Sequence, residues 1–270
     1  YTAVHKFMGN KYNIIGFNPW IFFNNGGNGD CLIGDCDNDG QNELIMSGGP
    51  MSRDSPVSPI EVFKWNGWRL VRYAEWDDQK GPSYVYMAGI GDTDQDGENE
   101  IVCGSISGVV VLNWNKNTKS FESTIIRDIN SWEDYPFACV CKDSDMDGKV
   151  EINVGYHSPK MSVFEWNGED YEVKFETEWP GEESVIEALD VGDVDEDGIV
   201  EVCVGTDIVH ILQWDGSTYV EESLIDETFG TLAVLNIGDC DNDGKNEINV
   251  APVFVDDGDD YIYWIFKYGW

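Results

Sequence analysis

The stretch Asp92-Thr-Asp-Gln-Asp-Gly-Glu-Asn-Glu100 decides how this chain is organised, because its pattern of acids and glycine occurs five times. The other copies are at 35–43, 143–151, 193–201 and 239–247. The first aspartates of successive copies are 57, 51, 50 and 46 residues apart. A period of this length is typical of proteins built from stacked structural repeats. We number these acidic loops 1 to 5 in chain order, and their residues as positions 1 to 9.

Short apolar segments flank each acidic loop. Tyr84–Ile90 precedes loop 2, and the segment after it begins at Glu100. Such runs, rich in β-branched and aromatic residues, predict two strands joined by the loop. A third strand ends in a tryptophan turn such as Val163-Phe-Glu-Trp-Asn-Gly168, where Asn-Gly is a hairpin signal, and a fourth follows at Tyr171–Phe175. Each period therefore holds about four antiparallel strands, the content of one propeller blade.

Five periods predict an all-β fold: a five-bladed β-propeller of four-stranded antiparallel blades, with residues 1–270 forming a single domain. After loop 5 the chain has a third strand and its turn at 261–270, but no fourth. The segments 4–10 and 11–17 look like the end of a third strand and a fourth strand. We expect an N-terminal strand to complete the last blade, because closure leaves no open sheet edge. Donation of that strand to a neighbouring molecule would instead build a homo-oligomer or polymer.

The acidic loops carry the oxygen ligands of a calcium site. Aspartates at positions 1, 3 and 5 surround one point, glycine at 6 permits the reversal, a backbone carbonyl near 7 adds an oxygen, and glutamate at 9 closes the shell. The alternative is a solvated acidic turn, but four carboxylates within nine residues repel one another unless a cation neutralises them. We predict about five calcium ions, one in each of the five loops. Their predicted ligands are Asp35, Asp37, Asp39, Gln41, Glu43, Asp92, Asp94, Asp96, Glu98, Glu100, Asp143, Asp145, Asp147, Lys149, Glu151, Asp193, Asp195, Asp197, Ile199, Glu201, Asp239, Asp241, Asp243, Lys245 and Glu247.

This pattern resembles the FG-GAP/VCBS repeat of integrin α-subunit propellers and certain fungal lectins. In those repeats a calcium ion lies in the hairpin between the first two strands of a blade. The glycine that precedes position 1 matches at Gly34, Gly91, Gly192 and Gly238, whereas Lys142 replaces it in the third repeat. That family usually builds seven or eight blades, so five blades is a departure from its pattern.

The charge of the chain excludes several classes of partner. With 52 acidic and 16 basic side chains the formal net charge is -36, which repels nucleic acid and anionic lipid surfaces and attracts cations. No apolar run is long enough to span a bilayer. Because the sequence begins with Tyr1 and modest calcium sites fill outside cells, we expect an extracellular, secreted or cell-surface protein whose signal peptide has been removed.

The seven cysteines form no CxxC pair, and most lie in strand-like segments, which favours buried small side chains. Cys36 and Cys240 occupy the same position in the first and last loops, so a disulfide between them stays open as an alternative. Only three histidines are present, without a nucleophile elbow, zinc-ligand cluster or phosphate loop. We therefore predict that the protein is not an enzyme.

An aromatic residue precedes each acidic loop and is a candidate ligand-binding residue. Flat rings on the loops of a propeller face stack well on sugars, although packing between blades would use the same residues. These candidates are Trp20, Trp76, Trp132, Trp179 and Phe229. The predicted function is recognition or adhesion by an extracellular, non-catalytic calcium-binding propeller whose partner is a glycan or a protein. The alternatives are a structural subunit of an extracellular polymer or filament, and a polysaccharide-active enzyme.

Overall fold

The computed structural model describes residues 2–9, 11–18, 26–50, 59–81, 83–181, 185–226, 231–252 and 264–267. Contacts divide the chain into two compact units, the first formed by 1–90 and 99–128 and the second by 91–98 and 129–270. The predicted single domain stays a prediction.

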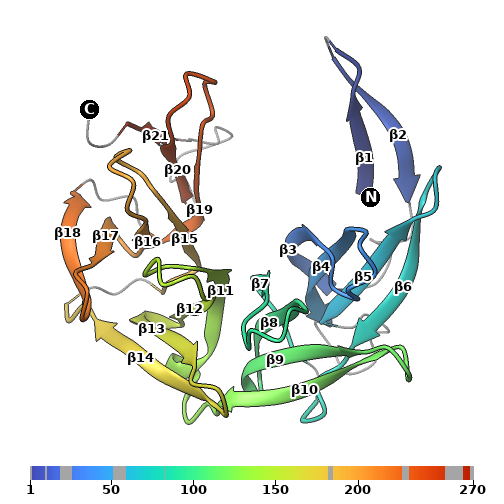
Figure 1. Ribbon diagram of the computed structural model, residues 1–270, viewed down its shortest axis with the longest axis horizontal. Coiled ribbons are helices and arrows are strands. Elements are labelled where there is room, and N and C mark those ends of the chain that lie inside the picture. Colours follow the sequence, from blue (N-terminus) through green and yellow to red (C-terminus); the bar gives the residue numbers. More distant parts are fainter. Residues whose placement is uncertain are drawn as a thin grey trace. The chain divides into compact units, whose positions relative to one another are not determined.

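The first unit holds three antiparallel sheets (Figure 1). A two-stranded sheet pairs β1 (Thr2–Phe7) with β2 (Tyr12–Asn18). The first blade has the order β3 (Gly26–Gly34), β4 (Glu43–Pro50), β5 (Ile60–Trp65) and β6 (Leu70–Trp76). The second blade has the order β7 (Ala88–Gly91), β8 (Glu100–Ser105), β9 (Gly108–Asn115) and β10 (Ser120–Arg127). The segment Gly91–Glu98, which contains most of loop 2 and leads from β7 to β8, belongs to the second unit.

The second unit holds the other three blades. The third blade follows a short 3-10 helix, η2 (Trp132–Asp134), and has the order β11 (Pro136–Lys142), β12 (Glu151–Tyr156), β13 (Ser158–Trp166) and β14 (Tyr171–Glu178). The fourth has the order β15 (Ala188–Gly192), β16 (Glu201–Gly205), β17 (Val209–Trp214) and β18 (Tyr219–Ile225). The fifth has the order β19 (Leu232–Gly238), β20 (Glu247–Pro252) and β21 (Trp264–Phe266).

The all-β fold class and its five propeller blades are confirmed. The sheet of the last blade has three strands among the described residues, and its completion by an N-terminal strand stays a prediction. As expected of consecutive strands, β1 pairs with β2. The backbone N–H of Met8 donates to the carbonyl of Lys11 at 2.8 Å, which closes a tight turn between them. A strand that follows its neighbour through so short a turn pairs with it at little entropic cost.

The core lies along the second strand of each blade. Strands β8, β12 and β16 are buried over their whole length, whereas β10 and β14 are largely exposed. A strand covered on both faces loses the in-and-out alternation of a half-buried strand, and β8 and β16 accordingly contain the continuous apolar runs 101–103 and 202–204. No helix in the described ranges is long and apolar enough to cross a membrane.

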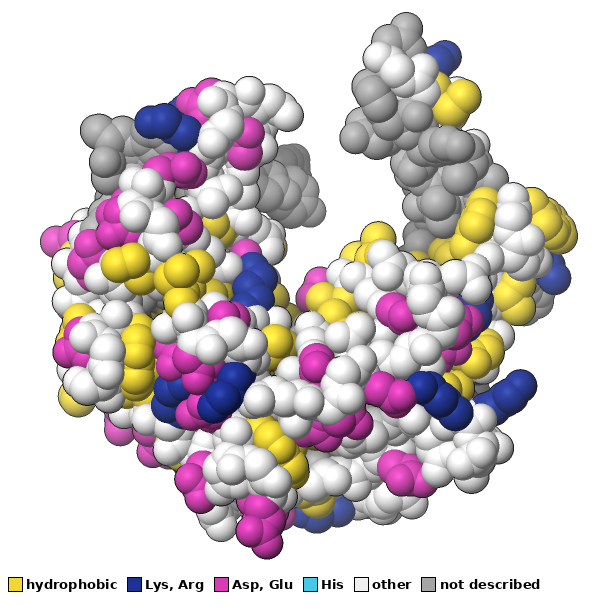
Figure 2. All heavy atoms as spheres, viewed as in Figure 1, with side chains coloured by type: hydrophobic (Ala, Val, Ile, Leu, Met, Phe, Trp, Pro, Cys, Tyr) yellow, Lys and Arg dark blue, Asp and Glu magenta, His cyan; other side chains and the backbone are white. Residues whose placement is uncertain are grey.

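Glycine allows two of these blades to approach closely. A Cβ atom on Gly155, in β12, would lie 2.3 Å from Cγ2 of Ile186, which leads into β15. Real Cβ contacts are longer than this, so only glycine fits without displacing the neighbouring blade. The outer surface is acidic: on the face shown in Figure 2, aspartate and glutamate (magenta) are more widespread than lysine and arginine (dark blue).

Candidate metal centre

All five acidic loops follow the same backbone course. Position 4 has a left-handed φ between 58° and 65° although it is never glycine; it is occupied by Asn38, Gln95, Met146, Glu196 and Asn242. Glycine at position 6 has φ between 88° and 91°. Its N–H donates to Oδ2 of the position 1 aspartate at 2.8 to 3.1 Å in every loop. The predicted role of glycine at 6 is confirmed, and the left-handed position 4 was not foreseen.

The closing glutamates are buried and aimed back at their own loops. In loops 1, 3, 4 and 5 the N–H of position 2 donates to one carboxylate oxygen of position 9 at 2.7 to 3.1 Å. Burial raises the pKa of both Glu151 and Glu201 to about 7. Desolvation disfavours a charged carboxylate, so a nearby cation would stabilise the ionised form.

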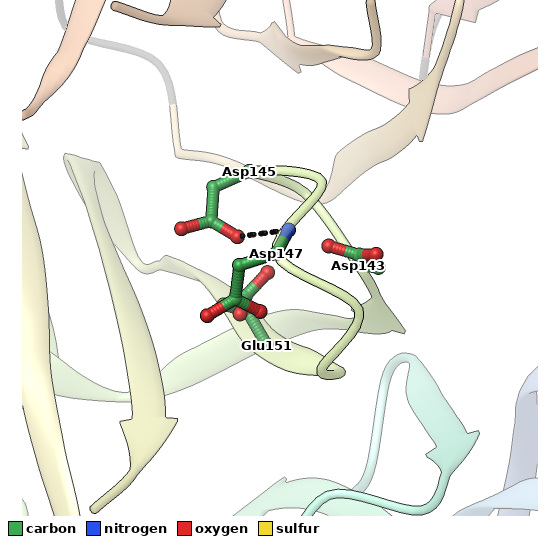
Figure 3. Close-up of side chains that lie close together, drawn as sticks. All are labelled: Asp143, Asp145, Asp147 and Glu151. Carbon is green, nitrogen blue, oxygen red and sulfur yellow. Dashed lines mark hydrogen bonds between the residues drawn. The ribbon is translucent and has the colours of Figure 1, made fainter. Parts of the chain in front are cut away.

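Each loop gathers at least three carboxylates. In loop 3 the side chains of Asp143, Asp145, Asp147 and Glu151 lie close together (Figure 3), with ligand atoms within 4.8 Å of one another. Groups of the same kind are Asp35, Asp37 and Asp39; Asp92, Asp94 and Asp96; Asp193, Asp195 and Asp197; and Asp239, Asp241 and Glu247. The position 7 residues Gln41, Glu98, Lys149, Ile199 and Lys245 donate their N–H to the position 5 aspartate at 2.7 to 3.1 Å.

Unsatisfied oxygens show that some of these groups fit a cation. The loop oxygens that are buried and have no hydrogen-bond partner are Oδ1 of Asp37, Asp92, Asp143 and Asp193, and Oε1 of Glu43, Glu151 and Glu247. A buried carboxylate oxygen without a donor is costly, and a hard cation such as calcium would satisfy it. Every acidic loop has at least one such oxygen, so the loop carboxylates have the chemistry of a cation site.

Lysine side chains that were not predicted as site residues reach three of the loops. Lys64 lies beside loop 1, Lys174 beside loop 3 and Lys267 beside loop 5, each paired with at least two carboxylates of its loop. The signal in the sequence was that Lys64 and Lys267 both come at the end of a third strand, directly before the turn aromatic.

Asparagines link neighbouring loops. Asn99 is at position 8 of loop 2, and its backbone N–H donates to Oδ1 of Asn38, at position 4 of loop 1. The Nδ2 of Asn38 donates in return to the carbonyl of Asn99. The Nδ2 of Asn99 donates to the carbonyl of Asp35 at 3.0 Å. Asn246, at position 8 of loop 5, donates its Nδ2 to the carbonyl of Asp193 in loop 4 at 2.8 Å. These links tie one blade to the next.

The predicted ligand-binding aromatics do not share one environment. Trp76 is buried in the hydrophobic core, so its ring has no free face for a ligand. Trp132 is 58% exposed, and its Nε1 donates to Nε2 of His157 at 3.1 Å. Trp179 stacks on the buried His210 with ring centroids 4.3 Å apart. Trp20 and Phe229 lie outside the described residues.

The seven cysteines are all free thiols. Cys36 and Cys240 each direct Sγ toward the closing glutamate of their own loop, at 3.6 Å from Glu43 and 3.1 Å from Glu247. The alternative of a disulfide between these two residues is therefore not what the structure shows.

Comparison with known families identifies the chain. The family described as KICSTOR complex protein kaptin matches residues 41–224, which span the first to the fourth blade. This chain belongs to the kaptin family. A search of the curated proteins finds no match.

Membership of the kaptin family corrects three predictions. The family description names a protein of the KICSTOR complex, and this match contradicts the predicted extracellular, secreted or cell-surface location. Recognition or adhesion by an extracellular propeller is likewise wrong as the function. The predicted partners, calcium and a glycan or protein ligand, are contradicted by the same match, which describes a protein of a complex. Calcium as a bound cofactor is a separate prediction and stays one. The error came from reading repeated acidic loops as a sign of an extracellular location, whereas loop chemistry does not specify a compartment.

Proposed function

We propose that this chain is a non-catalytic propeller subunit of an intracellular protein complex. The observation that supports this proposal is the match of residues 41–224 to the family of the KICSTOR complex protein kaptin. Propellers host many functions on one scaffold, so the fold alone does not carry the proposal. Stacked blades do, however, present a broad rigid surface on which other subunits can assemble.

Affinity purification tests this role. The full chain, tagged and expressed at its native level in its own cells, should co-purify the other subunits of such a complex in near-stoichiometric amounts. Quantitative mass spectrometry measures the ratio, and the tag alone is the control. Recovery of the chain without any of those subunits would contradict the proposal.

We propose in addition that the acidic loops bind a divalent cation as a structural cofactor, and that this cation is calcium. The buried, unsatisfied Oδ1 atoms of Asp92 and Asp193 support the proposal. When bound, the ion would supply positive charge to carboxylates that otherwise repel one another. The finer likeness of these loops to FG-GAP/VCBS repeats belongs to this proposal, without the extracellular role of those proteins.

Calcium-dependent melting tests the cofactor. A ligand that binds only the folded chain raises its melting temperature as its concentration increases above the dissociation constant. We expect calcium to stabilise the metal-depleted chain, and magnesium to do so less because it loses its waters reluctantly. Equal melting temperatures with calcium and with chelator would refute calcium binding.

A further inference from the structure

Lys64 occupies the centre of loop 1. Its Nζ lies 2.6 Å from Oδ2 of Asp37, 2.5 Å from Oδ2 of Asp39 and 3.4 Å from Oε1 of Glu43. Asp37 and Glu43 are both buried. These are three of the four carboxylates predicted to hold calcium in loop 1, so the ammonium group lies where the metal would bind.

Lys267 repeats this arrangement in loop 5. Its Nζ lies 2.9 Å from Oδ2 of Asp241, 2.6 Å from Oδ2 of Asp243 and 3.3 Å from Oε1 of Glu247. The preceding residue, Phe266, pairs with Ile248, which follows the closing glutamate. Lys64 is placed in the same way in the first blade, because Phe63 pairs with Leu44. The register of the third strand thus sets each lysine beside its loop.

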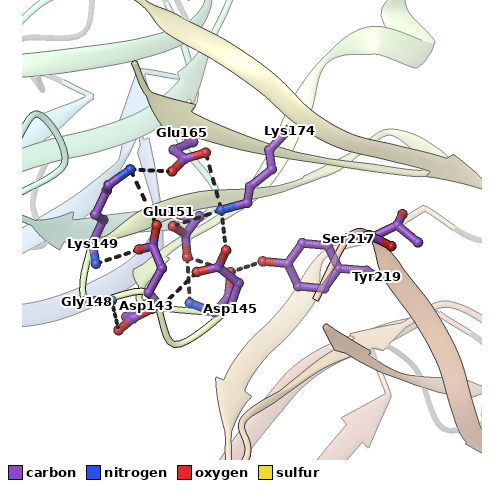
Figure 4. A network of polar contacts seen from close by, with 12 residues as sticks. Asp143, Asp145, Gly148, Lys149, Glu151, Glu165, Lys174, Ser217 and Tyr219 are labelled. Carbon is purple, nitrogen blue, oxygen red and sulfur yellow. Dashed lines mark hydrogen bonds and ion pairs between the residues drawn. The ribbon is translucent and has the colours of Figure 1, made fainter. Parts of the chain in front are cut away.

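Loop 3 receives its lysine from a different strand. Lys174 of β14 pairs with Asp145 and lies 3.7 Å from Oε1 of Glu151, with its side chain only 11% exposed (Figure 4). The pairing of β13 with β14 is irregular at Lys174. Its neighbours Val173 and Phe175 each face a residue of β13, whereas Lys174 faces none. An extra residue at a bulge redirects a side chain. Lys174 thereby brings one positive charge to loop 3, although the third-strand position holds Glu165.

Loops 2 and 4 have neutral amides at the position of these lysines. Gln213 lies opposite Glu201 in the strand pairing, and its Nε2 donates to Oε1 of Glu201 at 3.2 Å. Asn113 donates its Nδ2 to Oε1 of Glu100 at 3.4 Å. Within the described ranges, no lysine or arginine forms an ion pair with the loop aspartates: Asp92, Asp94, Asp96, Asp193, Asp195 and Asp197.

We infer that Lys64, Lys174 and Lys267 are the resident cations of loops 1, 3 and 5, so that only loops 2 and 4 take a divalent cation. The second half of this inference rests on the proposed calcium binding. An ammonium group within about 3 Å of the shared oxygens and a calcium ion in the same shell would repel each other strongly. Five similar sequences therefore encode two kinds of loop, and the predicted ion count falls from about five to two.

Exchange of the third-strand residues tests this division. Calcium bound to the metal-depleted full chain is counted by equilibrium dialysis. The wild type should bind two ions, Lys64→Gln should bind three, and Gln213→Lys should bind one. Lys80→Gln is the matched control, since Lys80 pairs with the exposed Asp128 away from every loop, and it should leave the count at two. Five ions in the wild type would overturn the inference and leave the calcium proposal intact.

Melting without metal tests the lysines independently of calcium. Lys174→Gln should lower the melting temperature of the chelated chain by roughly 5 °C relative to Lys80→Gln, because it leaves buried carboxylates without a cation. Gln213→Lys should raise the melting temperature of the chelated chain. Because this variant is expected to be more stable than the wild type, its result cannot be attributed to misfolding. If no calcium binds, the calcium proposal and the second half of the inference fail together, and the melting result alone decides the role of the lysines. Unchanged melting of both loop variants would overturn the role of the lysines.

Discussion

At the scale of single residues, the acidic loops depend on carboxylates that are expensive to bury. Glu201 is fully buried, yet one of its carboxylate oxygens accepts a hydrogen bond from the N–H of Val194 and the other accepts one from the side chain of Gln213. Burial raises its pKa to about 7, so the folded chain holds its proton more tightly than the unfolded chain does. The protonated form therefore contributes stability below the ordinary pKa of glutamate, and this contribution is lost as the pH rises toward 7.

The variant Glu201→Gln should show this pH dependence. In metal-free buffer, wild type and variant should differ little near pH 4.5, and the variant should become the more stable one by about 2–3 kcal/mol at pH 8, because glutamine has no charge to bury. Urea unfolding at several pH values measures the difference. Glu169→Gln, in an exposed turn, is the control. A difference between wild type and Glu201→Gln that stayed constant with pH would contradict the argument.

Position by position, the sequence indicated which carboxylates gather in each loop but not which lysines pair with them. Asp35, Asp37 and Asp39 could be recognised because they are adjacent in the chain. Lys64 could not, because it meets them only through the register of β4 with β5. The left-handed φ of Met146 was also beyond reach, since position 4 accepts several residue types that rarely adopt this conformation.

At the scale of elements, neighbouring blades are tied together by their loops. Asn246 donates from loop 5 to the backbone of loop 4. We expect Asn246→Ala to destabilise the chain by about 1 kcal/mol, because the carbonyl of Asp193 loses a donor. Chemical denaturation measures this change. Asn42→Ala, at the same position of loop 1 but exposed, should have no measurable effect. Equal effects of the two substitutions would refute the link.

Close packing between blades gives a second test. Gly155→Ala places a methyl group against Ile186, and we expect a loss of about 3 kcal/mol because a packed blade must shift. A Cβ atom on Gly238 meets no atom within 4 Å, so Gly238→Ala should be tolerated. Thermal melting compares the two. A Gly155→Ala variant as stable as Gly238→Ala would show that the blades yield easily.

The period of the acidic loops was sufficient to predict the blades, because each loop with its flanking strands is a local unit. The segments 4–10 and 11–17 were likewise recognised as two consecutive strands, and a local turn pairs β1 with β2. Side-chain positions that depend on strand register were not encoded in the same way. The unpredicted β14 irregularity at Lys174 likewise arises from strand pairing and not from composition.

At the scale of the whole molecule, acidic charge is the dominant electrostatic feature. The chain carries 52 acidic and 16 basic side chains, and three of its lysines are used within the acidic loops. Filling loops 2 and 4 with calcium would add four positive charges to a formal net charge of -36, which leaves it near -32. Repulsion among the remaining carboxylates therefore opposes the compact state with or without metal.

Salt should consequently stabilise this protein. Raising the sodium chloride concentration from about 10 mM to about 150 mM shortens the Debye length from about 30 Å to about 8 Å, which screens repulsion between exposed acids. We expect the melting temperature of the metal-free chain to rise by several degrees, because repelling pairs far outnumber the surface ion pairs that salt weakens. Choline chloride should act equally, since screening does not depend on the cation. A fall in melting temperature with salt would mean that ion pairs such as those of Lys64 and Lys267 outweigh the net charge.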